Sequence, residues 1–235
     1  MGGDGYRITF TGSESPCAST GAFRFSRPSG YSFVAGQYLS LTLETREGPQ
    51  TKHFSHCDAP DDAETLVLTR LTGSAFKDAL LALRPGDLAT MTGPFGRLVL
   101  PVGVDRAAFL VGGVGITPMR SIVRDSVLRG TGLTVLVFDG NLDETCIPMR
   151  EEFDSWEREN PGITFIHVLE RPSTSWTGER GFITAETVLR HCDPHDGWHW
   201  FVSGPPAMVD PMRRVLEAVG VDQEHSSFES FAGYL

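Results

Sequence analysis

Short runs of strand-forming residues, separated by turns rich in glycine and proline, occupy the first hundred residues of the chain. The runs cover residues 6–10, 22–25, 38–43, 66–71, 88–92 and 97–100. Turn sequences such as Pro28-Ser29-Gly30 and Gly93-Pro94 separate them. Five or six short strands joined by such turns predict a small antiparallel barrel.

One segment of this first part has the spacing of a helix instead. Phe76, Leu80 and Leu83 fall on one face of a helix drawn over residues 75–83. Ser74 directly precedes that segment, and a serine hydroxyl can accept a hydrogen bond from a free N–H group of the first turn. The pattern predicts a capped helix inserted between two strands of the barrel.

From about residue 104 the pattern becomes an alternation of apolar strands and amphipathic helices. The predicted strands cover residues 107–111, 133–138, 164–168 and 200–202, and the predicted helices cover residues 118–128, 148–159, 185–190 and 207–218. This alternation is typical of a parallel sheet covered on both faces. We therefore expect two domains: an antiparallel β-barrel over residues 1–103 and a doubly wound α/β domain over residues 104–235.

The composition is that of an ordinary globular protein, with 235 residues of which 40% are hydrophobic and 21% charged. The net charge is −10 and no run of lysine or arginine occurs, which argues against nucleic acid as a partner. The longest apolar run, residues 107–116, has about half the length of a membrane-spanning helix. We expect no membrane span.

The cysteines and the N-terminal residues favour a cytoplasmic protein. The first six residues have neither the basic nor the apolar segment of a secretion signal, and position six lacks the serine or threonine of a myristoylation site. The four cysteines are scattered and form no C-x-x-C pair, so we expect no iron–sulfur cluster and no structural zinc. In a chain of this length they favour reduced thiols, and a disulfide stays open.

The segment Gly112-Gly113-Val114-Gly115-Ile116-Thr117-Pro118 lies directly after a predicted strand and before a predicted helix. Glycines let the backbone approach a pyrophosphate, and the N–H groups of a helix start favour an anion. Thr117 has the side chain of a cap, and Pro118 suits the first helical position. Glycine-rich turns also serve plain packing, which is the alternative here. No G-x-x-x-x-G-K-[ST] motif is present, so an NTPase is disfavoured.

A second strand-to-helix turn, Ser203-Gly204-Pro205-Pro206-Ala207-Met208, contains two adjacent prolines. Prolines restrict the backbone and suit the start of a helix. The turn is expected at the same end of the sheet as residues 112–118, where open α/β sheets bind ligands. A stiff connection without a binding role is the alternative.

The third candidate segment, residues 51–60, lies in the predicted barrel. Strand alternation places Lys52 and Phe54 on one face and Ser55 on the other. An edge strand ending at Pro60 is the plain alternative. The chain contains only two lysines, Lys52 and Lys77, and both lie in segments that we select for phosphate contact.

Short motifs follow one another along nearly the whole chain. Those of the first part are G-Q-Y (36–38), K-x-F-S (52–55), S-A-F-K with L-x-x-G-D (74–87) and G-P-F-G (93–96). Those of the second part are G-G-x-G-I-T-P (112–118), W-x-G-E-x-G (176–181), S-G-P-P-A-M (203–208) and F-E-x-F-x-G-Y (228–234). In this order they resemble the ferredoxin–NADP reductase superfamily. Each motif is weak alone, and the resemblance depends on their shared order.

The resemblance implies a flavin bound between the two domains. It implies that Phe54 flanks the isoalloxazine, that Ser55 hydrogen-bonds near flavin N5, and that Lys52 meets the flavin phosphates. The N–H groups of the helix after Ser74 would add to the phosphate site. The expected flavin-binding residues are Lys52, His53, Phe54, Ser55, His56, Ser74, Ala75, Phe76 and Tyr234, the last covering the flavin from the C-terminal end.

The resemblance also implies that the second domain holds a nicotinamide nucleotide. The expected nucleotide-binding residues are Gly112, Gly113, Gly115, Thr117, Pro118, Asp139, Gly140, Ser203, Gly204, Pro205, Pro206 and Met208. Ser55 and Ser203 are expected beside the path of the hydride and are our catalytic candidates.

Four positions depart from the usual family pattern. Lys52 stands where relatives usually have arginine, so the two-pronged contact of a guanidinium with phosphate is lost and a point charge remains. FAD stays favoured over FMN, and both stay open. Ser203 stands where many relatives have cysteine. His56 and Cys57 replace small or aliphatic residues. His56 either tunes the flavin potential or relays a proton, or it is a loop side chain that faces solvent.

The choice between NADH and NADPH is expected after the second strand of the nucleotide domain, at residues 138–144. The segment contains Asp139, Asp143 and Glu144 and no basic residue. An acidic residue suits a free ribose hydroxyl, whereas a 2′-phosphate requires positive charge. We expect NADH to be preferred.

The segment His191–His199 contains three histidines and a cysteine at spacings that resemble a metal site. Pro194 and Gly197 interrupt the helix that would align them, so a connecting loop is the favoured interpretation and no metal is expected.

The sequence therefore predicts a flavoprotein reductase that passes a hydride from NADH to FAD and then electrons to a separate acceptor protein, such as a ferredoxin, a flavodoxin or an oxygenase component. A reductase of free flavin or small molecules is one alternative. A flavin-binding sensor or subunit without turnover is another. The sequence specifies neither the acceptor nor an oligomeric state.

Overall fold

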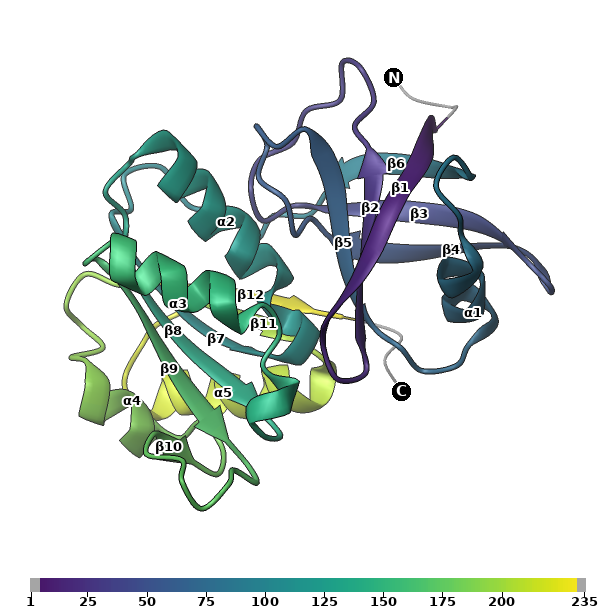
Figure 1. Ribbon diagram of the computed structural model, residues 1–235. Helices are drawn as coiled ribbons and strands as arrows, with labels where there is room; N and C mark the ends of the chain where they lie inside the picture. The colour runs from purple at the N-terminus through teal and green to yellow at the C-terminus, as the bar shows by residue number, and fades with distance from the viewer. Residues whose placement is uncertain (1–4, 232–235) are drawn as a thin grey trace.

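The computed structural model describes residues 5–231 and consists of two six-stranded sheets that lie side by side (Figure 1). The first sheet uses residues 6–95 and the second uses residues 106–230. The expected domain boundary between residues 103 and 104 lies in the segment that joins them. None of the helices between residues 5 and 231 is long and apolar enough to span a bilayer.

The first sheet is antiparallel and curves into a half-barrel, in the order β4-β3-β6-β1-β2-β5. Its strands are β1 (Tyr6–Cys17), β2 (Thr20–Ser26), β3 (Tyr38–Thr45), β4 (Gly48–Ser55), β5 (Glu64–Arg70) and β6 (Leu88–Phe95). Aromatic and aliphatic side chains from alternate positions of these strands fill its interior, as period-two patterning requires. The antiparallel architecture predicted for this half is confirmed.

The helix α1 (Ala75–Ala82) packs into this interior through Phe76 and Leu80. Ser74 is its N-cap, and the Ser74 hydroxyl accepts a hydrogen bond from the backbone N–H of Lys77 at 3.4 Å. Both the helix and its cap agree with the sequence prediction.

Three strand predictions in this half need correction. Residues 97–100 form no strand, because they cross from the first sheet to the second and Leu98 packs into the core between the sheets. The first strand continues past Phe10 to Cys17, where polar residues pair with β2 in a long hairpin. The edge strand given as the alternative for residues 51–60 is present as β4, but it ends at Ser55 and not at Pro60.

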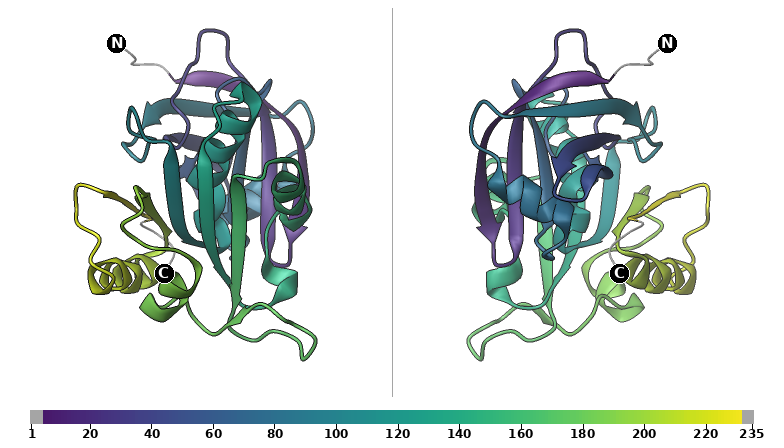
Figure 2. Two further views of the ribbon diagram at one scale, coloured as in Figure 1. Left: turned by 90° about the vertical axis from the view of Figure 1, so that its left-hand side faces the viewer. Right: turned by 90° about the vertical axis from the view of Figure 1, so that its right-hand side faces the viewer.

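The second sheet is parallel and has the order β10-β9-β8-β7-β11-β12. Its strands are β7 (Arg106–Gly112), β8 (Thr134–Asn141), β9 (Ile163–Leu169), β10 (Glu179–Arg180), β11 (His199–Gly204) and β12 (Ser226–Ser230). The helices α2 (Ile116–Arg129) and α3 (Arg150–Glu159) cover one face, and α4 (Ala185–His191) and α5 (Pro206–Ala218) cover the other (Figure 2). The doubly wound architecture is confirmed.

The start of α2 differs from the expectation. Gly113–Gly115 form one turn of 3₁₀-helix, and α2 begins at Ile116 with Gly115 as its N-cap. Thr117 therefore lies inside the first turn and donates its hydroxyl to the carbonyl of Val114 at 3.0 Å, so its predicted capping role is wrong. Pro118 lies two residues past the first helical position. The short strands β10 and β12 were not predicted.

Helix α2 is the main contact between the two halves. The Arg120 guanidinium donates to the backbone carbonyl of Cys57 and forms a bidentate ion pair with Glu152, at 2.7 and 2.8 Å. Arg124, one turn later, forms a second bidentate pair with Asp62, at 2.6 and 2.7 Å. These contacts hold the loop after β4, residues 56–62, against the half of the molecule built on the parallel sheet, residues 106–230, called the nucleotide half below after the expectation from the sequence.

Ser121 connects the same helix face to two further backbone groups. Its hydroxyl donates to the carbonyl of Asp58 at 2.6 Å and accepts from the N–H of Gly36 at 3.3 Å. Gly36 has a φ of +95°, and the carbonyl of Leu98 occupies the space that a Cβ atom would need. Only glycine allows this approach, which explains the first residue of the G-Q-Y motif.

We predict that Arg120→Met costs about 3 kcal/mol in free energy of unfolding, because it leaves the buried Cys57 carbonyl without its donor and leaves Glu152 with only a 3.6 Å contact to Arg124. Urea unfolding of the full chain measures the difference. Arg129→Met is the matched control, because Arg129 is exposed and its pair with Asp125 spans 3.6 Å, so its expected cost is below about 0.5 kcal/mol. Equal costs for the two variants would contradict the assigned role of Arg120.

Candidate functional site

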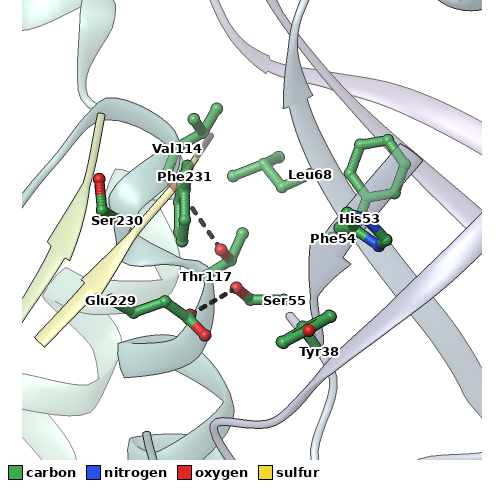
Figure 3. Close-up of a pocket in the computed structure, with 10 residues that line it drawn as sticks. All are labelled: Tyr38, His53, Phe54, Ser55, Leu68, Val114, Thr117, Glu229, Ser230 and Phe231. Carbon is green, nitrogen blue, oxygen red and sulfur yellow. Dashed lines mark hydrogen bonds between the residues drawn. The ribbon is translucent and has the colours of Figure 1, made fainter. Parts of the chain in front are cut away.

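A cavity of about 270 Å³ lies where the half-barrel meets the carboxyl end of the parallel sheet (Figure 3). Both halves contribute to its wall, which is partly apolar and contains few polar groups, as small-molecule sites usually do. The lining residues are Tyr38, His53, Phe54, Ser55, Leu68, Val114, Thr117, Glu229, Ser230 and Phe231.

Ser55 and Glu229 face each other across this cavity. Ser55 ends β4 and is buried, and its hydroxyl donates to Glu229 Oε2 at 3.1 Å (Figure 3). Glu229 lies on β12, far away in the sequence. Burial raises the pKa of Glu229 above its usual range, and the hydrogen bond from Ser55 only partly opposes that effect. The pair places a hydroxyl and a carboxyl group with a raised pKa at one point of the wall.

Aromatic side chains line the cavity beside this pair. Phe231 lies on the side of the nucleotide half, next to Val114, and Tyr38 lies on the barrel side (Figure 3). Tyr38 contacts the His53 ring edge to face at 5.7 Å, and His53 Nδ1 is 2.7 Å from the Ser40 hydroxyl. Flat rings on both sides leave a slot that suits a planar aromatic ligand.

Phe54 lines the cavity, and its expected place beside the flavin ring stays a prediction. Its ring points away from the Ser55–Glu229 pair into the barrel core, where it stacks on Phe76 at 5.8 Å (Figure 3). Lys77 Nζ lies 4.9 Å from the ring centroid. Phe54 thus belongs both to the lining of the cavity and to the barrel core.

Positive charge gathers between β4 and α1. Lys52 is exposed on β4, whereas Lys77 is buried and donates to the Thr69 hydroxyl. Burial, and next the charge of Lys52, lowers the pKa of Lys77 to about 8. The N-terminus of α1 at Ser74 and Ala75 adds backbone N–H groups nearby. An anion bound here would be favoured by all three features.

The two turns that we expect to bind the nucleotide lie in contact, at the same end of the sheet as predicted. The Ser203 hydroxyl donates to the Gly115 carbonyl at 2.6 Å, and a Cβ atom on Gly115 would meet the Ser203 carbonyl. Likewise, a Cβ atom on Gly112 would lie 3.0 Å from Met208 Sδ. Gly113 has a φ of +52° and open space where its Cβ would be. Packing therefore requires glycine at positions 112 and 115, whereas the backbone at Gly113 is accessible.

Ser203 is fully buried and does not line the cavity. Its hydroxyl is used to join the two turns, so its role beside the hydride path stays a prediction. Pro118, Gly204, Pro205 and Pro206 belong to the same pair of turns.

Asn141 is a residue that the sequence analysis missed. Its Oδ1 accepts from the backbone N–H of Gly113 at 3.2 Å, and its Nδ2 is buried without a hydrogen-bond partner among the described residues. An unpaired buried donor is costly, so it is normally matched by a bound group. The position beside the glycine turn suits an oxygen of a nucleotide. The sequence could have indicated this residue, because it lies two residues after Asp139 at the end of a parallel strand.

Asp139, the expected ribose ligand, is fully buried, and its Oδ2 contacts His167 Nδ1 at 3.1 Å. The more accessible acids of this segment are Asp143, which caps the turn after β8, and Glu144, which accepts from Ser173. Gly140 and the exposed Leu142 lie between them. The negative charge predicted for this loop is present, and only part of it is accessible.

His56 is completely buried rather than facing solvent, so that alternative is wrong. Its Nε2 lies 2.8 Å from the Tyr31 hydroxyl and its Nδ1 lies 3.1 Å from Asp58 Oδ1. It stacks on Phe33 at 3.6 Å. Asp58 also pairs with Arg27. His56 does not line the cavity but belongs to the buried network that holds the loop directly after Ser55.

Four of the expected site residues line the cavity: His53, Phe54, Ser55 and Thr117. Lys52, Ser74, Ala75 and Phe76 lie on the adjoining β4–α1 surface or beneath it. Tyr234 lies outside the described residues. Glu229 and Phe231, which belong to the C-terminal motif, were not assigned roles from the sequence.

The histidines of residues 191–199 do not converge. His191 Nε2 contacts Glu179 at 2.8 Å, and His199 Nε2 contacts the Ser227 hydroxyl at 2.9 Å. Within residues 5–231, no three His, Cys, Asp or Glu side chains are grouped so that they could hold a metal ion.

Comparisons with known proteins agree with this arrangement. The family model described as "Oxidoreductase NAD-binding domain" matches residues 109–214. The chain is 29% identical to "Ferredoxin--NADP reductase B" of Sorangium cellulosum, an alignment that covers 88% of this chain and 89% of that protein. It is also 29% identical to "NADH-cytochrome b5 reductase 1" of Aspergillus terreus, covering 84% of this chain and 72% of that protein.

Among solved structures, a ferredoxin NADP+ reductase from Neisseria gonorrhoeae with bound FAD and NADP has the same fold. Its TM-score is 0.82 at 18% identity, and the match covers 97% of this chain and 99% of that one. At this identity the similarity concerns the fold.

We predict that Glu229→Gln stabilises the protein at neutral pH and not in acid. The raised pKa of Glu229 means that burial disfavours its charged form, so the stability it contributes is complete below about pH 4, the pKa of an unfolded glutamate, and is lost as pH rises through the folded pKa. Glutamine removes that loss. The Tm of variant and wild type, measured from pH 4 to pH 8, should diverge as pH rises, whereas parallel curves would show that Glu229 is not perturbed.

Proposed function

The chain belongs to the ferredoxin–NADP reductase superfamily and is an oxidoreductase, and we propose that it passes a hydride from NADH to FAD and electrons onward to a separate acceptor protein. The observation that supports this most is the cavity between the halves, where Ser55 of the half-barrel meets Glu229 of the nucleotide half. Because both halves line this cavity, a flavin held by the half-barrel and a nicotinamide held by the nucleotide half would lie against each other there.

The residues present fit a flavin dinucleotide. The slot between Tyr38 and Phe231 suits the ring system, and the adjoining surface with Lys52 and the α1 N-terminus suits the phosphates. When bound, FAD supplies an acceptor for a hydride from the nicotinamide and a store from which electrons leave singly or in pairs. The protein's contribution is to position the two ring systems and to exclude water.

Ser55 and Glu229 provide the polar chemistry of this cavity. The Ser55 hydroxyl is held at 3.1 Å from Glu229 Oε2, and burial raises the pKa of Glu229, so that it keeps its proton to a higher pH than an exposed glutamate would at the same place. A protonated Glu229 can donate a hydrogen bond into the cavity, and Ser55 can accept or pass that proton. Ser55 is therefore our first catalytic candidate, with Glu229 as its partner.

The nucleotide half holds NADH through the two turns at the ends of β7 and β11. The unpaired Nδ2 of Asn141 provides a donor for a phosphate or ribose oxygen, and the open space beside Gly113 lets that oxygen approach the backbone. Ser203 keeps the turns together by its hydrogen bond to Gly115. Its proposed place beside the hydride path requires that this contact reorganise when the nucleotide binds.

NADH is the proposed donor because the end of β8 and the turn after it, residues 138–144, contain Asp139, Asp143 and Glu144 and no basic side chain. A 2′-phosphate at this loop would meet negative charge without a counter-ion, which is unfavourable. The "NADH-cytochrome b5 reductase 1" relative is consistent with this choice.

The first experiment mixes the purified yellow protein anaerobically with NADH and, separately, with NADPH. We expect NADH to bleach the visible flavin absorbance rapidly and NADPH to do so at least about tenfold more slowly. Indifference to both nucleotides would reject the reductase function and leave a flavin-binding subunit.

A second experiment tests the nucleotide preference through Leu142→Arg. Leu142 is exposed in the acidic loop, so an arginine there can pair with a 2′-phosphate, and we expect the ratio of kcat/KM for NADPH to that for NADH to rise about tenfold. Leu128→Arg on α2 is the matched control, since Leu128 is similarly exposed and lies outside the acidic loop. If both variants keep the wild-type ratio, the loop does not select the nucleotide.

A further inference from the structure

The hairpin formed by β1 and β2 reaches from the half-barrel to the nucleotide half (Figure 1). Its two-residue turn follows Cys17, which pairs with Thr20. At the hairpin tip, the backbone N–H of Ala18 donates to the carbonyl of Thr145 at 3.2 Å. Thr145 belongs to η2 (Glu144–Cys146), the short helical turn after β8.

This backbone hydrogen bond brings two cysteines together across the interface. Cys17 immediately precedes its donor residue, and Cys146 immediately follows its acceptor residue. With standard bond lengths, the Cα atoms of Cys17 and Cys146 are then at most about 8 Å apart. A disulfide requires roughly 4.4–6.8 Å between Cα atoms, so a small shift at the hairpin tip brings the pair into range.

Both thiols are free and only partly buried. Burial raises the pKa of Cys17, and the neighbouring Cys146 adds to that effect, which agrees with two thiols close enough to interact. Because both side chains are partly exposed, an oxidant as small as hydrogen peroxide can reach the pair from solvent. In contrast, Cys57 is completely buried.

We propose that Cys17 and Cys146 form a redox-active pair, which hydrogen peroxide converts into a disulfide that joins the β1–β2 hairpin to η2. One thiolate attacks a peroxide oxygen, the O–O bond breaks, and water leaves together with formation of a sulfenic acid. The second thiol attacks that sulfur, the S–O bond breaks, and a second water leaves. The two sulfur atoms lose two electrons in total, and the peroxide gains them.

The disulfide connects the two halves at a point remote in sequence from the α2 contacts. It restricts separation of the halves and fixes the turn after β8, which is part of the acidic loop. Because the bond closes a loop of about 130 residues in the unfolded chain, it stabilises the folded state. Reducing conditions release it, as expected for cytosolic redox pairs.

The test oxidises the full-length, flavin-loaded protein with hydrogen peroxide, removes the peroxide with catalase, and blocks free thiols under denaturing conditions. Peptide mass spectrometry without reduction should then show the Cys17 and Cys146 peptides linked and lighter by two hydrogen atoms, and dithiothreitol should separate them. Oxidation should also raise the Tm by about 5 °C or more, reversibly.

Cys17→Ser and Cys146→Ser should each abolish both changes. Cys192→Ser is the matched control and should retain them, because Cys192 is also partly buried and lies on the opposite face of the parallel sheet. Recovery of Cys17 and Cys146 from oxidised wild type as separately alkylated thiols or as sulfinic acids would overturn the proposal. A link between any other pair of cysteines would overturn it as well.

Discussion

The candidate site depends on the contact between helix α2 and the loop after β4. Arg120, Ser121 and Arg124 hold residues 56–62 by three charged or polar contacts that are largely removed from solvent. Ser55 directly precedes this loop, whereas Glu229 belongs to the other half. The distance between the Ser55 hydroxyl and the Glu229 carboxyl group is therefore determined by how α2 seats against the barrel. The buried His56–Asp58 pair stiffens the same loop from the barrel side.

The architecture followed from the sequence because two different periodicities occupy two parts of the chain. Alternating apolar runs with Gly/Pro turns gave the antiparallel sheet, and strand–helix alternation gave the parallel one. The errors have local physical reasons. Residues 97–100 are apolar because Leu98 packs between the sheets, not because they pair with a strand. The strands β4 and β12 lie at sheet edges, where one side is open and the apolar pattern is weak.

The site was predictable only in part. The glycines at 112, 113 and 115 and the turn at Ser203 were recognised, and they meet because their strands are neighbours in a parallel sheet. The Ser55–Glu229 pair was not, since its members are separated by most of the chain and only tertiary packing brings them together. Asn141 was missed for another reason: asparagine at a strand end is common, and its unpaired Nδ2 is visible only in three dimensions.

A crystal structure of the protein with FAD tests the central claim most directly, because the claim concerns where the ring system lies. We expect the isoalloxazine in the cavity between Tyr38 and Phe231, with a ring nitrogen within hydrogen-bond distance of the Ser55 hydroxyl and the phosphates beside Lys52 and the start of α1. A cavity filled by the chain itself under saturating FAD, or a flavin bound at any other surface, would contradict the account.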